Sequence, residues 1–411
     1  MSTLKKYLPM VFLVITLLFQ LTALKFIWHI ELISSILNLL MLLALNMVFL
    51  IGLFRSRFRL TVWCFYIIPG LLVFLGMSAN ILYNINKDLV NLSYIGLLIP
   101  WGAYLAAPVF LKQSRYFDRP LWYVFYCFML LGVTLALCEY FNVFVLGGLL
   151  KLRELDTSGG VFLAGFFSLF YPLESGGVHF RMYGWFLEPG TLAMYLIPAT
   201  AYAYYQKAYL SVVVMLIGVF FAFSIGAFIS LLLMPLFFYM FNKKRFFSFA
   251  SIVMILMLMG GISQLGFLKG KYDAKQASRM TRLDNIEQGI SELPGLILSH
   301  PFGFSFQGES GTGNSDYSAK AFATFMPMYK FVLGGFFALI GYLIVLLLAV
   351  IVSCIASTRN NLTLEEKAVF STLIPLSLFV VQRTTIWESA LFAFLFAPSI
   401  IRQLDKKEIT K

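Results

Sequence analysis

The sequence predicts an all-α, polytopic integral membrane protein with about twelve transmembrane helices and two long extracytoplasmic loops. Of its 411 residues, 60% are hydrophobic and 12% are charged, whereas a typical globular domain has about 25% charged residues. The apolar residues gather in runs of about 20, the length that one helix needs to cross a hydrocarbon core of about 30 Å. Backbone amides find no water inside a bilayer, so such runs must form helices. This composition excludes a soluble globular domain.

The apolar runs cover 7–27, 32–54, 60–83, 89–111, 120–145, 189–205, 208–241, 246–265, 331–356, 368–381 and 387–401. The run 208–241 is too long for one span, because as a single helix it would measure about 51 Å. A break at Ser224-Ile225-Gly226 divides it into two short spans and brings the total to about twelve.

The basic residues stand mainly in the short connections between these runs. With twelve spans, clusters such as Lys243-Lys244-Arg245 all fall on one side of the membrane. The positive-inside rule makes that side cytoplasmic and places both termini there. The net charge of +12 is therefore expected to orient the chain in a lipid bilayer, and no nucleic acid partner is predicted.

The predicted spans and loops divide the chain into five segments. Residues 1–145 carry spans 1 to 5, 189–265 carry spans 6 to 9, and 331–411 carry spans 10 to 12 with a cytoplasmic tail. The two long loops, 146–188 and 266–330, face the opposite side. Within the first loop, 161–171 is apolar but only about half a bilayer long, so we expect it to lie in the interface or to re-enter the membrane.

The end of the first loop places a cation, a glycine and an acid directly before a helix, as Arg181, Gly184 and Glu188. A structural interpretation exists: Pro189 suits a first helical turn, Glu188 complements the helix dipole, and Arg181 anchors a span end. A binding or catalytic role is the alternative.

The second loop carries Arg279, Arg282, an amphipathic stretch over 283–298, and His300 followed by Pro-Phe-Gly. Taken alone, a histidine in this position is more often a structural hydrogen-bonding group than a base.

Glu139 lies in the outer half of the fifth span, where an ionisable group is costly and is expected to have a partner. Arg181 is one candidate. Arg383, in the turn before Trp387 and the last span, is the other. A purely structural ion pair would satisfy the same expectation.

The chain resembles the bacterial polysaccharide polymerases and O-antigen ligases, which act on glycans linked to undecaprenyl diphosphate. The matching pieces are Arg181-Met-Tyr-Gly-Trp-Phe-Leu-Glu-Pro189, the break Phe223-Ser-Ile-Gly226, and Arg279 to Gly303. The resemblance covers about 160–388. Ligases carry an arginine where this chain has Ile225, and a His-Asn pair that is missing from 313–316. Both departures favour a polymerase.

The resemblance implies a metal-independent glycosyltransferase without a cofactor, in the bacterial inner membrane. It would transfer a growing glycan from undecaprenyl diphosphate to the next lipid-linked repeat unit at the periplasmic face, for an O-antigen, lipopolysaccharide or exopolysaccharide. A chain-length regulator is an implied partner. Arginines suit a leaving diphosphate because the guanidinium is permanently charged and offers paired donors. The expected catalytic residues are Arg181, Arg282 and either Glu188 or His300 as base, and the expected substrate-binding residues are Arg279, Tyr183, Gly184, Arg383, Glu139 and Trp387.

Two alternatives stay open at this point. A ligase would leave the glycan ladder intact and lose transfer to a terminal acceptor lipid. A transporter or flippase would also suit twelve spans, although carriers usually show two related halves with polar sites at the midplane, and no internal repeat is apparent here.

Overall fold

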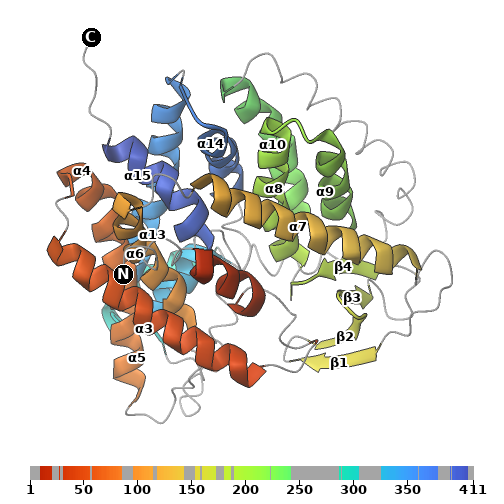
Figure 1. Cartoon of the computed structure of the whole chain (residues 1–411). Coiled ribbons are helices and arrows are strands. Elements are labelled where there is room, and N and C mark those ends of the chain that lie inside the picture. Colours follow the sequence, from red (N-terminus) through yellow and green to blue (C-terminus); the bar gives the residue numbers. More distant parts are fainter. Residues whose placement is uncertain are drawn as a thin grey trace. The chain divides into compact units, whose positions relative to one another are not determined.

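The computed structural model describes residues 10–20, 27, 31–55, 58–85, 96–113, 118–142, 153–157, 160–172, 180–186, 189–222, 224–241, 287, 289–304, 325–359, 361–377, 389 and 391–405. These residues are mostly helical (Figure 1). The chain divides into two compact units. Unit 1 holds Met1–Leu37, Tyr116–Lys271 and Ser357–Leu378, and unit 2 holds Asn38–Arg115, Tyr272–Ala356 and Phe379–Lys411.

Four helical segments of the described part are long and apolar enough to cross a membrane: Leu32–Phe54, Leu60–Tyr83, Arg119–Tyr140 and Met326–Ser357. The first lies in α3 (Glu31–Arg55) and the third in α7 (Asp118–Tyr140). The second joins α4 (Leu60–Val62), the π-helix η2 (Trp63–Ile67) and α5 (Ile68–Ile85), and the fourth is α13 (Met326–Ser357). They match four of the predicted runs, while the total of about twelve stays a prediction.

Most of the other described helices are shorter and belong to the following elements. They are η1 (Thr16–Gln20), α6 (Ile99–Gln113), α8 (Pro189–Tyr205), α9 (Tyr209–Ala222), α10 (Ile225–Phe241), α14 (Leu364–Ser377), η8 (Phe392–Phe396) and α15 (Ala397–Asp405). The predicted break in 208–241 is confirmed, because α9 ends at Ala222 and α10 begins at Ile225. The predicted start of a helix at Pro189 is confirmed as well. The predicted run 246–265 lies outside the described residues.

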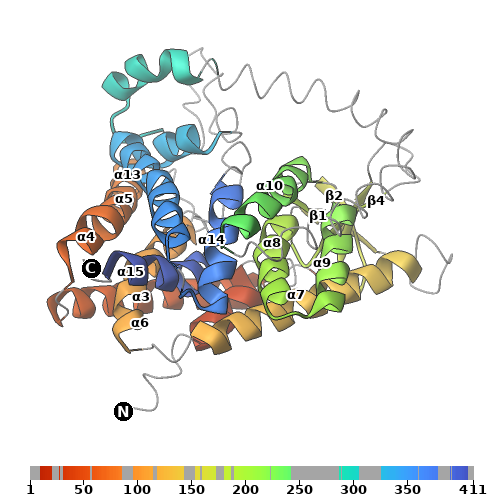
Figure 2. The same ribbon diagram turned by 90° about the horizontal axis from the view of Figure 1, so that it is seen from above.

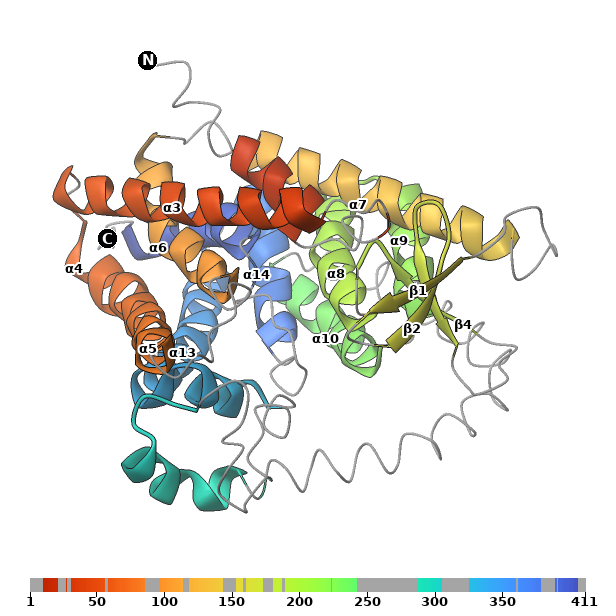
Figure 3. The ribbon, with the colours of Figure 1, turned by 90° about the horizontal axis from the view of Figure 1, so that it is seen from below.

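In unit 1, α8 is the central helix and contacts α7, α9, α10 and α14 (Figures 2 and 3). The connection from α8 to α9 is very tight. Lys207 adopts the left-handed conformation with φ 65°, its N–H donates to the carbonyl of Tyr204 at 3.0 Å, and the N–H of Ala208 donates to that of Ala203 at 2.9 Å. This is the Schellman pattern that ends a helix.

Unit 1 also contains a small sheet in the predicted first loop. Its strands are β1 (Arg153–Thr157), β2 (Gly160–Ala164), β3 (Leu169–Pro172) and β4 (Phe180–Gly184). They pair antiparallel in the order β1-β2-β3-β4. The stretch 161–171 therefore forms β2, β3 and the turn between them. The expectation of an all-α chain holds for the spans and is corrected by this sheet.

In unit 2, α5 and α13 approach each other at glycines. A Cβ on Gly76 would lie 2.5 Å from the carbonyl oxygen of Gly334, and one on Gly341 would lie 2.5 Å from that of Pro69. Small residues at such crossings allow the close backbone packing that holds membrane helices together. Between these two contacts α13 is kinked, because Gly335 has φ 66°.

A further helix of unit 2, over 289–299, packs beside α13. It is drawn in teal in Figure 2 and includes part of the amphipathic stretch predicted over 283–298. Its contact with α13 is a cluster of buried apolar side chains: Leu296, Met328, Phe331, Val332 and Leu339.

Candidate functional site

Strand β4 carries the motif of the first loop into α8. Arg181 pairs with Tyr171 of β3 and Met182 with Phe170, and the register then shifts so that Leu169 faces Gly184. Tyr183 is thus the extra residue of a β-bulge, a device that redirects side chains and is common near functional sites. Gly184 ends the strand in the left-handed conformation, φ 56°, which glycine adopts without strain. Only the main chain of Arg181 is described.

Tyr183 and Gly184 are held by packing. Tyr183 is 8% exposed, and its ring meets that of Phe162 edge-on with centroids 5.3 Å apart. The expected substrate contact of Tyr183 stays a prediction, and in this structure its ring fixes β4 to β2. A Cβ on Gly184 would reach Leu192 of α8 at 3.4 Å and Ala136 of α7 at 3.8 Å.

Glu139 of α7 is 5% exposed and is bound to the turn between β2 and β3. Its Oε1 accepts a hydrogen bond from the backbone N–H of Phe167 at 2.8 Å. Its Oε2 fills the space beside Gly165, where a Cβ would lie only 2.5 Å from that oxygen. The carboxylate expected to meet an arginine thus holds a hairpin turn against the helix.

The end of α7 therefore gathers three of the predicted site residues, Glu139, Tyr183 and Gly184, with the main chain of Arg181. Helices α7, α8 and α9 all contact β4 (Figure 3). Since a strand packed on helices is more rigid than a free loop, the arginine is carried by a fixed backbone.

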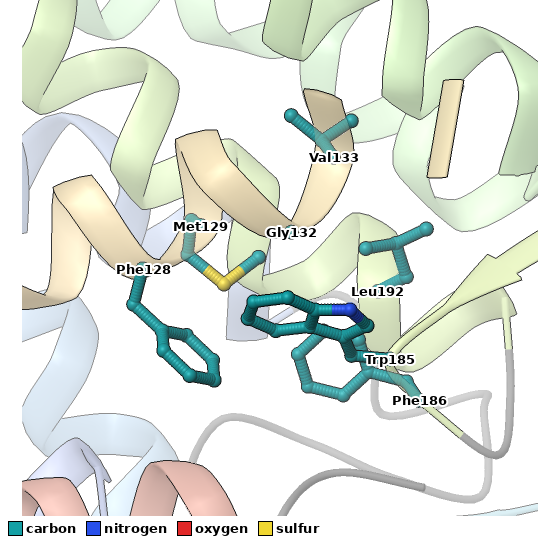
Figure 4. A pocket seen from close by; sticks show the side chains of 7 residues that line it. All are labelled: Phe128, Met129, Gly132, Val133, Trp185, Phe186 and Leu192. Carbon is teal, nitrogen blue, oxygen red and sulfur yellow. The ribbon is translucent and has the colours of Figure 1, made fainter. Parts of the chain in front are cut away.

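Two residues of the motif, Trp185 and Phe186, line a narrow apolar pocket between α7 and α8 (Figure 4). Trp185, at 6% exposure, forms one wall, and a Cβ on Gly132 would lie 2.9 Å from its ring. Within the described part, the indole N–H has no hydrogen-bond acceptor. The pocket is lined by Phe128, Met129, Gly132, Val133, Trp185, Phe186 and Leu192.

In unit 2, His300 stands at the end of helix 289–299. Its ring stacks on Phe304 with centroids 4.3 Å apart, and its Nδ1 lies 2.8 Å from the hydroxyl of Ser299. That hydroxyl also lies 3.0 Å from the carbonyl oxygen of Gly295, the usual acceptor for a serine in a helix. In the tautomer that carries the proton on Nδ1, this oxygen accepts Nδ1–H and Nε2 keeps a lone pair.

The turn that follows His300 is anchored by Asn80 of α5, which is 1% exposed. Its Nδ2 donates to the carbonyl oxygens of Phe302 at 2.7 Å, Phe304 at 3.2 Å and Val332 at 3.4 Å. Gly303 has φ 89°, and a Cβ there would collide with the carbonyl of Val332. The glycine of the His-Pro-Phe-Gly motif is therefore required by a turn packed against α13.

The kink of α13 completes this anchor. The backbone N–H of Phe336 donates to the carbonyl oxygen of Pro301 at 3.0 Å, and the N–H of Phe304 donates to that of Val332 at 2.9 Å. Backbone groups released by the kink at Gly335 are thus satisfied by the turn. His300 is therefore fixed relative to two helices that are candidate membrane spans.

One further charged residue of unit 2 escaped the sequence analysis. Lys330 is 2% exposed, and its Nζ lies 5.5 Å from the ring centroid of Trp101 and 5.8 Å from that of Tyr329. The predicted second loop ends at Lys330, whereas α13 begins earlier, at Met326. The signal was a lysine one turn inside an apolar helix, which marks a functional candidate in membrane proteins.

Five predicted site residues lie outside the described residues: Glu188, Arg279, Arg282, Arg383 and Trp387. The expected contact between Glu139 and an arginine is therefore untested. In the described part, no group of three or more histidine, cysteine or carboxylate side chains is arranged to hold a metal ion.

No protein family, no curated protein and no solved structure matches this chain. The resemblance to polysaccharide polymerases rests on the order and composition of its motifs, and the function has to be argued from the site itself.

Proposed function

We propose that this chain is a polysaccharide polymerase that transfers a growing glycan from undecaprenyl diphosphate to the next lipid-linked repeat unit. The observation that carries the proposal is the fixed position of the first-loop motif. Arg181 belongs to a strand that packs on α7, α8 and α9. A charge held on a rigid element stabilises a transition state without reorganising at the moment of reaction.

The leaving group explains the need for arginine. In the reaction, the bond between the anomeric carbon and the diphosphate oxygen breaks, and both electrons leave with the diphosphate. Arg181 is the first candidate to neutralise that charge. Arg279 and Arg282, from the second loop, are the others, because guanidinium groups bind phosphate oxygens through paired donors.

The attacking group is a sugar hydroxyl of the acceptor unit, which forms a new bond to the anomeric carbon and gives up its proton. His300 is one candidate base: in the tautomer in which Nδ1–H donates to the hydroxyl of Ser299, Nε2 carries the lone pair that takes this proton. Glu188 is the alternative base. A single displacement of this kind inverts the anomeric centre.

The proposed location is the periplasmic face of the bacterial inner membrane, with both termini in the cytoplasm. Apolar helices that could span a bilayer and basic connections on one side support it. Labelling of single cysteines from each side of intact cells tests the orientation, and labelling of either long loop from the cytoplasm contradicts it.

The decisive experiment incubates the purified protein in nanodiscs with a lipid-linked repeat unit and resolves the products by size. The expected product is a ladder of multiples. Arg181→Ala is expected to reduce ladder formation by about 10² to 10³, the typical effect of one transition-state donor. Arg153→Ala, an arginine of β1 in the same sheet, is the matched control and should retain the ladder.

Three outcomes contradict the proposal. An intact ladder with Arg181→Ala removes the assigned role of that arginine. Transfer of a finished glycan to a separate acceptor lipid, with no ladder, indicates a ligase. In sealed proteoliposomes, movement of the lipid-linked unit across the membrane without joining indicates a flippase.

A further inference from the structure

Helix 289–299 of unit 2 has two different apolar faces. One face packs on α13, through Leu296 and the partly buried Leu293 and Ile297. The packed side chains recur every three to four residues, as expected for a helix that buries one stripe. That stripe accounts for the amphipathic pattern of the sequence.

The adjacent face is exposed and also apolar. Leu298 is 86% exposed and Ile290 is 57% exposed, and with Pro294 they form a row spaced four residues apart, which lies on one side of a helix. Phe302, just after the helix, is 43% exposed. A helix whose free face meets water carries charged residues there, but the exposed positions of 290–302 include no charged side chain.

This exposed face continues into the surface of a membrane-spanning helix. The ring of Phe302 lies 6.3 Å from that of Tyr83, at the end of the candidate span Leu60–Tyr83. Tyr83 is 57% exposed and Leu82 is 65% exposed. Exposed apolar side chains on such a span form the surface that meets lipid. The row formed by Ile290, Pro294 and Leu298 continues this lipid-facing surface past the end of α5.

We propose that helix 289–299 lies in the lipid–water interface of the bilayer, with Ile290, Leu298 and Phe302 among the acyl chains. The partner is the lipid surface. Amphipathic helices bind in this way, with the apolar face a few ångströms below the headgroups. The inference does not depend on the proposed glycan chemistry. Its consequence is that His300, at the end of this helix, stands at the depth of lipid headgroups.

Spin-label accessibility of the full chain in nanodiscs tests this placement. Single cysteines are introduced after replacement of Cys64, Cys127, Cys138 and Cys354, and each is labelled with a nitroxide. Leu298→Cys is the main probe and Ile290→Cys is a second, independent one. Leu75→Cys, 58% exposed on α5, is the lipid reference, and Asn361→Cys, between α13 and α14, is the aqueous reference.

Oxygen concentrates in lipid, whereas a nickel chelate stays in water. We expect oxygen to relax the labels at 298 and 290 more strongly than the nickel chelate does, and the lipid reference label at 75 should behave in the same way. The label at 361 should show the reverse. Nickel accessibility at 298 and 290 equal to that at 361 places the helix in water and overturns the proposal. Protection from both agents with spin–spin broadening indicates a second copy of the chain on this face, and it overturns the proposal too.

Discussion

The contact between Glu139 and Gly165 leads to a quantitative prediction. The substitution Gly165→Ala adds one methyl group in the turn between β2 and β3. The three nearest atoms to the new Cβ all belong to Glu139, with Oε2 at 2.5 Å, Cδ at 3.0 Å and Oε1 at 3.2 Å. Gly165 does not have a left-handed backbone, so alanine meets no conformational strain there, and the collision is with the carboxylate alone.

The magnitude follows from that distance. Ordinary contact begins near 3.4 Å, so the carboxylate must move by about 0.9 Å (3.4 minus 2.5). Overpacking of a buried site by one methyl group costs about 1 to 3 kcal/mol. Glu139→Ala should cost about 1 to 3 kcal/mol, because it leaves the N–H of Phe167 without its acceptor.

The double mutant is the informative variant. With Glu139→Ala the colliding atoms are gone, so Gly165→Ala should then cost close to nothing, and the coupling free energy should be about 1 to 3 kcal/mol. Reversible unfolding in mixed micelles, followed by tryptophan fluorescence, measures the four free energies. Trp185 lies in the same unit and reports on the sheet and α7.

Additive costs for the two substitutions would refute the reasoning, since they would show that the methyl group meets something other than the carboxylate. A silent Gly165→Ala in the native background would refute it equally, because the turn would then have room for the extra group.

Two further predictions concern other parts of the chain. Asn80→Ala removes the donor shared by Phe302, Phe304 and Val332 and should cost about 1 to 2 kcal/mol, with faster amide hydrogen exchange at Phe304. Asn46→Ala, which loses only a bond to Leu42 of its own helix, should cost clearly less, and equal effects would argue against the anchor. Lys207→Gly should stabilise the protein by about 1 kcal/mol, because glycine tolerates the left-handed conformation seen there, while Lys207→Ala should give no gain in the same unfolding assay.

The sequence predicted the long helices well because hydrophobic runs dominate their energetics. The runs 32–54 and 60–83 coincide with described candidate spans, and the break at Ser224 followed from the length of a bilayer. The sheet was not predicted, because β1 is polar and β2 is a short apolar strand. Strands of five residues give too weak a period-two pattern beside apolar runs of about 20 residues.

The sequence predicted which residues belong to the candidate site, but it did not predict the contacts that these residues make. Glu139 was expected to need a partner, and the described partner is a backbone N–H, which leaves no trace in sequence. The sequence shows the glycine of the His-Pro-Phe-Gly motif but not why a glycine is needed there. The need arises from a turn that is anchored by Asn80, 222 positions away from Phe302. Lys330 was missed because the start of α13 was placed five residues too late.

The Asn80 anchor also bears on how the protein is assembled. Asn80 is synthesised 222 residues before Phe302 and 252 residues before Val332. The hydrogen bonds between its amide and these carbonyl oxygens can therefore form only after α13 has been made. Burying a side-chain amide in hydrocarbon is less costly when its hydrogen bonds are made, so these bonds favour the docking of α13 and the turn of His300 on α5. The turn is thus secured late, in the same step that closes unit 2.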